Sequence, residues 1–332
     1  MSFAANSNSA ASTPTSATPS CPVVIVLATY NPNAEFFLQQ IRSLQAQTFS
    51  NWQCLILDDA SRPESLDYIR NTVAGDARFQ VQQNPKNMGA SCSFMRALAL
   101  VPQTASYLAF CDQDDVWHPS KLSEQVRILS KGEFMLTFCD RALIDSAGGL
   151  MNSQPWIDTR RQDLEPTLEE LIFRNTIGGN SMMFNFQAIK AYLPLDMTTR
   201  PLFFHDAVVA TLVAMNGRIH SDARQFVLYR QHENNLVGHS TQFEARKIVH
   251  LMKSSRRTAM ERIQLLQTIQ DLLARKQNLL PQLEKIRRLK NVYQNPIRFL
   301  AYGLELCIRR PHFIKHYVLL ELGIVVLKFK PL

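Results

Sequence analysis

Three carboxylates follow the apolar stretch Tyr107 to Cys111. They are Asp112, Asp114 and Asp115, and a helix start at Pro119 comes just beyond them. Clustered carboxylates repel one another, so they persist chiefly where a cation or a base needs them. Asp112 and Asp114, two positions apart, suit a hard divalent ion such as Mg²⁺ or Mn²⁺ that takes its other ligands from a diphosphate. The alternative is a solvated acidic turn that only precedes the helix.

A carboxylate suited to proton transfer opens the apolar segment 205–216, where His205 and Asp206 stand side by side. Transfer of a group to a hydroxyl needs a base that takes the proton as the oxygen attacks, which makes Asp206 the candidate base. An aspartate at the start of a helix is also a good N-cap, and position alone is compatible with both roles.

A third polar group follows the apolar stretch 225–229. It comprises Arg230, Gln231, His232, Asn234 and Asn235. The imidazole of His232 can complete the coordination of a metal, and the planar guanidinium of Arg230 can hold diphosphate oxygens. The alternative for His232 is a surface histidine with ordinary hydrogen bonds.

Apolar stretches alternate with amphipathic ones through the first half of the chain. The apolar stretches predict strands at Val23 to Leu27, Cys54 to Leu57, Phe79 to Gln82, Tyr107 to Cys111 and Phe134 to Phe138. The amphipathic stretches predict helices at Ala34 to Gln47, Pro63 to Val73, Ala90 to Leu100 and Ser120 to Leu129. This alternation predicts an α/β fold with a doubly wound, mostly parallel sheet that binds ligands at the carboxyl ends of its strands.

The alternation weakens beyond residue 150. The elements predicted there are a helix at Leu168 to Phe173, a loop at Asn175 to Ser181, a helix after Asp206 and a strand at Gln225 to Tyr229. We expect this half to supply the acceptor side of a site.

Polar residues stand where the first three predicted strands end. They are Thr29 and Tyr30 after the first strand, Asp58 and Asp59 after the second, and Asn87 and Gly89 in the turn after the third. A glycine in such a turn lets the backbone approach a ligand closely, although an ordinary strand-to-helix turn is the alternative.

The formal charge of +8 is unevenly distributed. Up to residue 240 there are 18 Lys and Arg against 22 Asp and Glu, a balance of −4, and from residue 241 there are 18 against 6, a balance of +12. Residues 1–20 are rich in Ser, Ala, Thr and Asn, which predicts a disordered tail. We therefore expect a boundary near residue 240 and one domain at 21–240. A basic helical appendage is expected at 241–332.

Scattered cysteines without a CxxC pair, and a start without a secretory signal, indicate a cytoplasmic protein. No run of about 18 apolar residues predicts a membrane span. The basic region predicts peripheral attachment to the anionic inner face of the cell membrane. It lacks the aromatic pattern and the zinc or RNP signatures of nucleic-acid binding. Docking of the C-terminal helices on the catalytic domain, or on a second copy in a homo-oligomer, is the alternative.

Four segments together resemble the family 2 glycosyltransferases of the GT-A fold. They are VVIVLATYN, QTFSNWQCLILDDAS, NPKNMGAS and FCDQDDVWHPSKL, in the order and spacing of that family. The resemblance covers about residues 22–240. It implies a catalytic domain at 21–240, with a nucleotide-binding half at 21–130 and an acceptor half at 131–240. It implies that Tyr30 and Asp59 contact the nucleotide base, and that Asp112 and Asp114 form the DxD pair that serves the ribose and the metal.

The resemblance also implies roles for neighbouring residues. Asp58 and Asp115 are expected to support the pair, and Asp206 matches the catalytic base of the (E/H)D site. The segment from Arg230 resembles the YRQHxNN motif of bacterial rhamnosyltransferase-like enzymes. The residues expected on the acceptor side are Trp117, Gly179, Asn180 and His205. Simple packing is the alternative for the tryptophan.

The function implied is that of an inverting, metal-dependent glycosyltransferase acting in the synthesis of cell-surface polysaccharides such as O-antigen. Its donor would be a nucleotide diphosphate sugar, such as dTDP-rhamnose or a UDP-hexose, and its acceptor a lipid-linked saccharide. An inactive nucleotide-sugar-binding or scaffold protein of the same fold is the alternative, which the intact acidic pair and base oppose. A nucleotidyltransferase would carry a glycine-rich, basic loop after the first strand, where this chain has ATYNPNAEF.

Overall fold

The computed structural model of the protein describes residues 23–151, 165–173, 175–193, 204–232, 247–274, 280–295 and 302. In this part of the chain the strands form one eight-stranded sheet in the order β3-β2-β1-β4-β7-β6-β8-β5. The strands are β1 (Val23–Thr29), β2 (Trp52–Asp58), β3 (Phe79–Gln83), β4 (Tyr107–Cys111), β5 (Val116–Trp117), β6 (Leu136–Ile144), β7 (Met182–Asn185) and β8 (Ile219–Arg230).

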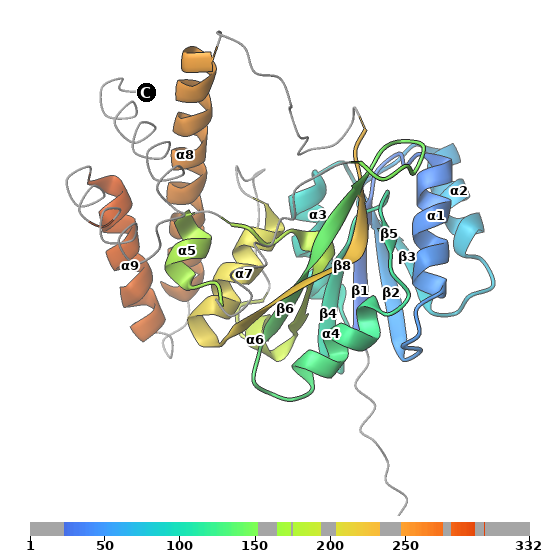
Figure 1. Ribbon diagram of the computed structural model, residues 1–332, viewed down its shortest axis with the longest axis horizontal. Helices are drawn as coiled ribbons and strands as arrows, with labels where there is room; N and C mark the ends of the chain where they lie inside the picture. Colours follow the sequence, from blue (N-terminus) through green and yellow to red (C-terminus); the bar gives the residue numbers. More distant parts are fainter. Residues whose placement is uncertain are drawn as a thin grey trace, which may run out of the picture.

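Helices cover both faces of this sheet (Figure 1). They are α1 (Ala34–Gln45), α2 (Pro63–Val73), α3 (Ala90–Leu100), α4 (Lys121–Leu129), α5 (Leu168–Phe173), α6 (Gln187–Lys190), α7 (His205–Asn216), α8 (Lys247–Ala274) and α9 (Leu280–Gln294), with a 3-10 turn, η2, at Gly179–Ser181. The predicted α/β fold with helices on a mostly parallel sheet is therefore confirmed.

The direction of the strands places their carboxyl ends at one edge. β1 pairs in parallel with β2 and β4, and β2 pairs in parallel with β3. The short strand β7 is antiparallel to both β4 and β6, so β6 points the same way as β4. β8 then pairs in parallel with β6. All five strands that the sequence predicted in the first half thus run in one direction.

The strand β1 shows why two layers of helix are needed. Its alternate residues Val24 and Val26 are buried in one core cluster with side chains of α3, while Ile25 and Leu27 are buried in the other with side chains of α1. A strand buried on both faces reads as a continuous apolar run, which is why the sequence indicates it clearly.

The strands β1, β2 and β3 exceed their predicted bounds by one to three residues, and β6 and β8 extend much further. β6 continues to Ile144 rather than ending at Phe138, and β8 begins at Ile219 rather than at Gln225. Both extensions contain polar residues, and the β6–β8 pairing shifts register around Asp140. The polar residues at this irregularity interrupt the apolar pattern, so the sequence signal ends too early.

The C-terminal helices α8 and α9 share a core with helices that cover the sheet. Leu265 and Ile269 of α8 and Ile286 of α9 are fully buried in the same cluster as side chains of α3 and α7. Figure 1 shows both helices beside α5 and α7, away from α1 and α2. The predicted tail at 1–20 and the predicted boundary near residue 240 lie outside the described residues. Within the described part, no helix is both long and apolar enough to cross a bilayer.

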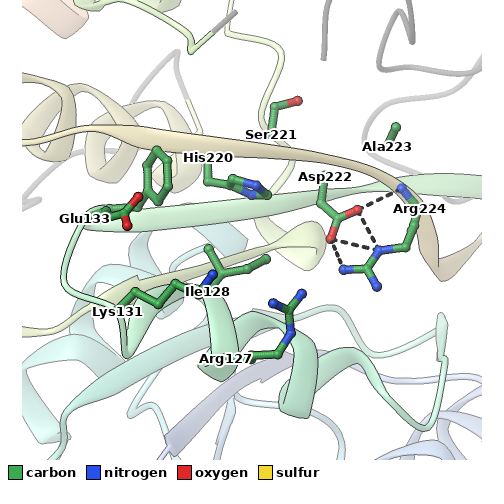
Figure 2. A pocket seen from close by; sticks show the side chains of 10 residues that line it. Arg127, Ile128, Lys131, Glu133, His220, Ser221, Asp222, Ala223 and Arg224 are labelled. Atoms are coloured by element: carbon green, nitrogen blue, oxygen red, sulfur yellow. Dashed lines mark hydrogen bonds and ion pairs between the residues drawn. The ribbon is translucent and has the colours of Figure 1, made fainter. Parts of the chain in front are cut away.

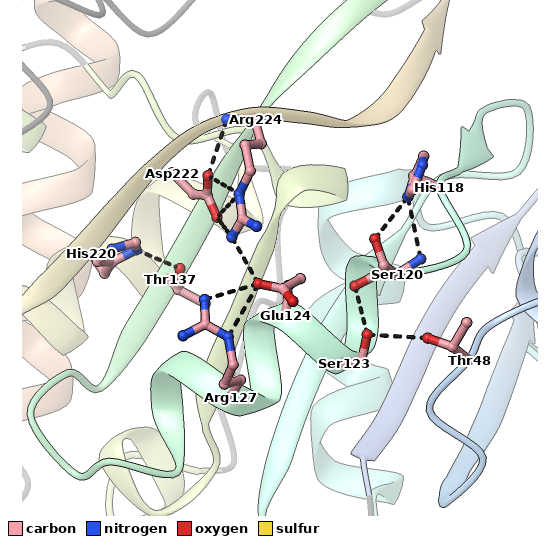
Figure 3. Close-up of polar contacts among 10 residues, drawn as sticks. All are labelled: Thr48, His118, Ser120, Ser123, Glu124, Arg127, Thr137, His220, Asp222 and Arg224. Atoms are coloured by element: carbon pink, nitrogen blue, oxygen red, sulfur yellow. Dashed lines mark hydrogen bonds and ion pairs between the residues drawn. The ribbon is translucent and has the colours of Figure 1, made fainter.

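An ion-pair network joins α4 to β8 (Figure 3). The Glu124 carboxylate lies 2.9 Å from guanidinium nitrogens of both Arg127 and Arg224, and Arg224 also pairs with Asp222 at 2.7 Å. A cavity of about 480 Å³ lies beside this network, with Lys131 and His220 in its wall (Figure 2). Because it is near the amino ends of β6 and β8, it lies at the edge opposite to the one where ligands of such sheets bind.

Candidate active site

The acidic loop, residues 112–115 between β4 and β5, carries the predicted acidic pair. Asp112 and Asp114 are both half-buried. Burial, together with the neighbouring charges of Asp114 and Asp206, raises the pKa of Asp112 to about 7, and the charge of Arg141 opposes this. Two carboxylates that destabilise each other's charge in this way favour the approach of a cation.

The loop after β8 meets the acidic pair. His232 Nε2 lies 2.8 Å from Asp114 Oδ2, and the imidazole packs on Phe36 with ring centroids 5.6 Å apart. Among the described residues, no three His, Cys, Asp or Glu side chains converge as a complete metal site. The oxygen donors present nevertheless fit Mg²⁺ or Mn²⁺, which are held by one or two carboxylates, substrate phosphates and water. His232 is placed to add a nitrogen ligand.

Asp115 is buried between three chain segments. Its Oδ2 accepts a hydrogen bond of 2.5 Å from Asn180 Nδ2, and its Oδ1 accepts one of 3.1 Å from the backbone N–H of Arg230. Burial raises its pKa well above the ordinary value, while these two donors favour the ionised form. Asp115 thus fixes the acidic loop to η2 and to the end of β8.

Asp206 lies in the first turn of α7. Its carboxylate accepts hydrogen bonds from the backbone N–H groups of Ala207 and Gly179 at 2.6 and 3.2 Å, and from Asn175 Nδ2 at 3.1 Å. Burial raises its pKa to about 6, against these donors and the charges of Arg141 and Arg262. The helix N-cap is Phe204, which makes no side-chain capping bond, so Asp206 is not the N-cap.

The end of β1 lies beside the acidic loop. Gln113 Oε1 accepts hydrogen bonds from Thr29 Oγ1 at 2.8 Å and from the backbone N–H of Tyr30 at 2.9 Å. The Tyr30 side chain is 48% exposed, so it is not a core aromatic. An open tyrosine ring at this edge is available for stacking.

The end of β2 holds the turn after β3. Asp59 is buried and accepts hydrogen bonds from Asn84 Nδ2 and from the backbone N–H groups of Met88 and Gly89, at 2.7, 2.9 and 2.7 Å. Asn87 Nδ2 donates to the Asp59 carbonyl at 3.2 Å, and Gly89 adopts a φ of +87° that favours glycine. Asp58 accepts from the backbone N–H of Ser61 and from Gln83 Nε2. Both carboxylates therefore organise the turns that line the edge.

Comparison with known proteins identifies the chain. The model of glycosyl transferase family 2 matches residues 24–192, which is 169 of the 332 residues. The chain is a member of this family. The matched segment contains the acidic loop and η2, and ends before Asp206.

A curated relative of this family 2 protein is the UDP-Glc:alpha-D-GlcNAc-diphosphoundecaprenol beta-1,3-glucosyltransferase WfgD of Escherichia coli. It is 30% identical over 127 residues, which are 37% of this chain and 47% of WfgD. The chain spans about half the length of the first curated relatives that it matches.

Two solved structures share the fold of this family 2 protein. S. aureus TarS 1-349 in complex with UDP-GlcNAc has a TM-score of 0.56 at 13% identity, over 93% of this chain and 92% of that one. The mannosyltransferase PcManGT of Pyrobaculum calidifontis, in complex with GDP-Man and Mn2+, has a TM-score of 0.50 at 12% identity, over 92% and 86%. These similarities confirm the GT-A fold that the sequence predicted.

The position of Arg230 corrects one expectation for this family 2 protein. Its side chain is 1% exposed, and its guanidinium donates to Gln39 Oε1 at 2.6 Å and to the carbonyl oxygens of Asp114 and Asp145 at 2.9 and 3.3 Å. It also lies over the Phe36 ring. Arg230 therefore holds the acidic loop from inside rather than facing a diphosphate.

Two residues expected on the acceptor side lie in the core instead. Trp117 is buried with the Lys121 ammonium 3.6 Å from its ring centroid. The His205 imidazole stacks on Phe94 at 3.9 Å, and burial lowers its pKa to about 3. Among the described residues, neither ring nitrogen has a hydrogen-bond partner. It is a neutral packing residue. The other two, Gly179 and Asn180, are buried and hold Asp206 and Asp115.

Sequence reasoning missed several residues of this site. Gln113 and Asn175 position polar groups through the hydrogen bonds given above, and Arg141 and Arg262 supply the positive charges that act on Asp206. Gln113 stands within the acidic segment, which was a usable signal. Nothing in the pattern indicated Arg141 or Arg262, because each is one basic residue in an otherwise ordinary strand or helix.

The structural role of Arg230 predicts a specific loss of stability. Arg230→Met removes the donors of several buried acceptors, each of which costs about 1–3 kcal/mol when left unpaired. We expect the free energy of unfolding to fall by at least about 2 kcal/mol in urea titrations. Arg127→Met, at a side chain that is 54% exposed, is the control and should change it little. A stable Arg230→Met variant that has lost affinity for nucleoside diphosphates would contradict this assignment.

Proposed function

We propose that the protein is an inverting, metal-dependent glycosyltransferase that moves a sugar from a nucleotide diphosphate donor to a lipid-linked saccharide acceptor. The observation that carries the proposal is at η2. The backbone N–H of Gly179 bonds to Asp206, and the side chain of the next residue, Asn180, bonds to Asp115. Two consecutive residues thus hold the candidate base and the acidic loop at fixed positions beside η2.

The donor is bound along the carboxyl ends of β1, β2 and β4. The exposed ring of Tyr30 offers a flat apolar face to the nucleotide base, beside the turn that Asp59 organises. A UDP-hexose is the first candidate donor, supported by the UDP-Glc named for WfgD and the UDP-GlcNAc in the TarS complex. dTDP-rhamnose is the second, supported by the YRQH segment at residues 229–232.

Asp114 and Asp112, with His232, would hold a divalent metal. The Mn2+ in the PcManGT complex supports this. When bound, such an ion neutralises charge on the departing diphosphate.

Asp206 acts on the acceptor. In its ionised form it takes the proton from the acceptor hydroxyl while that oxygen attacks the anomeric carbon from the side opposite the diphosphate. Because the oxygen attacks opposite to the departing diphosphate in a single displacement, the new bond has the inverted configuration. The acceptor is a saccharide carried on a lipid diphosphate, a proposal supported by the acceptor in the name of WfgD.

Metal dependence is tested by chelation with the purified protein. Transfer from a panel of UDP-, GDP- and dTDP-sugars is measured with Mn²⁺, with Mg²⁺ and with excess EDTA. We expect EDTA to abolish transfer and added Mn²⁺ or Mg²⁺ to restore it, because the acidic pair has to hold a cation to bind a diphosphate. Full transfer in EDTA would refute the metal, and no transfer from any donor would favour the inactive binding protein.

The role of Asp206 is tested by substitution and by pH. Asp206→Asn should lower kcat by roughly 10² or more with nearly unchanged donor affinity, the usual contribution of a positioned base. For the unsubstituted protein, activity should fall as the pH is lowered through about 6, because the carboxyl becomes protonated and can no longer accept a proton. Asp67→Asn, on the exposed side of α2, is the control. Loss of donor affinity in Asp206→Asn would make Asp206 a ligand or a structural residue.

The basic C-terminal region attaches the protein to the cytoplasmic face of an anionic membrane. Because α8 and α9 share the catalytic core, truncation near residue 240 would expose that core. Arg287 and Arg288 of α9 are exposed and can be changed with the fold intact.

Charge reversal therefore tests attachment. Arg287→Glu with Arg288→Glu should weaken binding to anionic vesicles about tenfold or more, since each basic group near such a surface contributes about 1 kcal/mol. Arg62→Glu with Arg70→Glu, at exposed positions beside α2, is the matched control. Binding is measured by co-sedimentation with the vesicles. The proposal is overturned if neither the parent nor the control binds, or if the parent, the control and the α9 variant bind equally.

A further inference from the structure

A second arginine, Arg141, lies beside the candidate active site and could take the diphosphate-binding role that the sequence pattern assigned to Arg230. Arg141 is a half-buried residue of β6, at the irregularity in the β6–β8 pairing. Its Nη1 lies 3.5 Å from Asn180 Oδ1, and its guanidinium lies 5.4 Å from the centroid of the Tyr229 ring. The contact with Asn180 is at the long limit of a hydrogen bond. The guanidinium therefore lies beside the residue that fixes the acidic loop.

The charge of Arg141 acts on both halves of the site. It opposes the rise that burial causes in the pKa values of Asp112 and Asp206. The geometry agrees, because Asn180, which the guanidinium contacts, bonds to Asp115, and the preceding residue, Gly179, bonds to Asp206. Arg141 thus lies beside the turn that holds both the acidic loop and the candidate base, where the bond between sugar and diphosphate is expected to lie during transfer.

Gly178 makes room for this side chain. A methyl group added at Gly178 would lie 2.3 Å from Arg141 Nη1 and 2.9 Å from its Cζ. The backbone of Gly178 has φ −85° and ψ 143°, values that any residue adopts, so its conformation does not require glycine. A side chain at position 178 would therefore displace the guanidinium from its present place.

We propose that Arg141 is the residue that binds the β-phosphate of the nucleotide diphosphate donor, the role that the sequence pattern assigned to Arg230. The proposal rests on the proposed function. A planar guanidinium matches two phosphate oxygens, and these oxygens gain negative charge as the bond to the sugar breaks. Arg230 is unsuited to this role because its donors are directed to protein oxygens in the interior.

Binding of nucleotides by the full-length protein tests this. Isothermal titration with Mn²⁺ present compares UDP with UMP, GDP with GMP, and dTDP with dTMP, and the pair that binds is used further. The ratio of diphosphate to monophosphate affinity reports the β-phosphate contact, and a merely structural role would lower both affinities together. For Arg141→Gln we expect this ratio to fall about 10- to 100-fold, the usual range for a hydrogen bond to a charged group, with monophosphate affinity unchanged.

Further variants keep the test decisive. Arg141→Lys retains a charge without the planar fork, and should lose roughly tenfold of the ratio even if Arg141→Gln fails to fold. Gly178→Ala keeps Arg141 in the sequence but displaces its guanidinium, and should also lower the ratio of diphosphate to monophosphate affinity. Arg127→Gln, at the opposite edge of the sheet, should leave it unchanged. An unchanged ratio in Arg141→Gln or Arg141→Lys overturns this proposal alone, whereas no nucleotide binding by the parent protein overturns the proposed function as well.

Discussion

The hydrogen bond between Asp115 and Asn180 is the interaction on which the site depends. Asp115 follows β4 and Asn180 precedes β7, and the same carboxylate also accepts the backbone N–H of Arg230 at the end of β8. Withdrawing a carboxylate from water is costly, and the donated hydrogen bonds offset that cost only while all three segments stay together. The residues next to Asn180 extend this constraint, because Gly179 holds Asp206 and Gly178 admits Arg141. One short turn therefore sets the positions of the acidic loop, the candidate base Asp206 and the Arg141 guanidinium.

The charges left around this turn explain what the site can bind. Burial raises the pKa values of Asp112 and Asp206, and the neighbouring charges of Asp114 and Asp206 raise that of Asp112 further. A bound cation stabilises the ionised form of these carboxyl groups. A cation beside an arginine in turn attracts a polyvalent anion. A diphosphate satisfies both requirements. The same burial that makes Asp206 costly to ionise gives it the basicity that proton removal from a hydroxyl requires.

The sequence predicted best what is both regular and buried. The bounds of α2, α3 and β4 agree with the structure, because an apolar stripe or run decides each of them. The prediction failed where a ligand-binding role was inferred from the type of a residue alone. Arg230 and Trp117 have side chains suited to ligands, but they are buried, and burial is set by contacts with distant segments such as the one containing Gln39. Arg141 was missed for the converse reason, since a polar residue within a strand gives no local signal.

The stereochemistry of the product tests the central claim, a single displacement in which Asp206 faces the diphosphate across the anomeric carbon. The reaction is run with the nucleotide sugar that supports transfer, and the anomeric configuration of the newly formed bond is read from proton NMR coupling constants soon after mixing. The account predicts a configuration opposite to that of the donor. A product that retains the donor's configuration would contradict it, because retention requires a second displacement or a different path of attack.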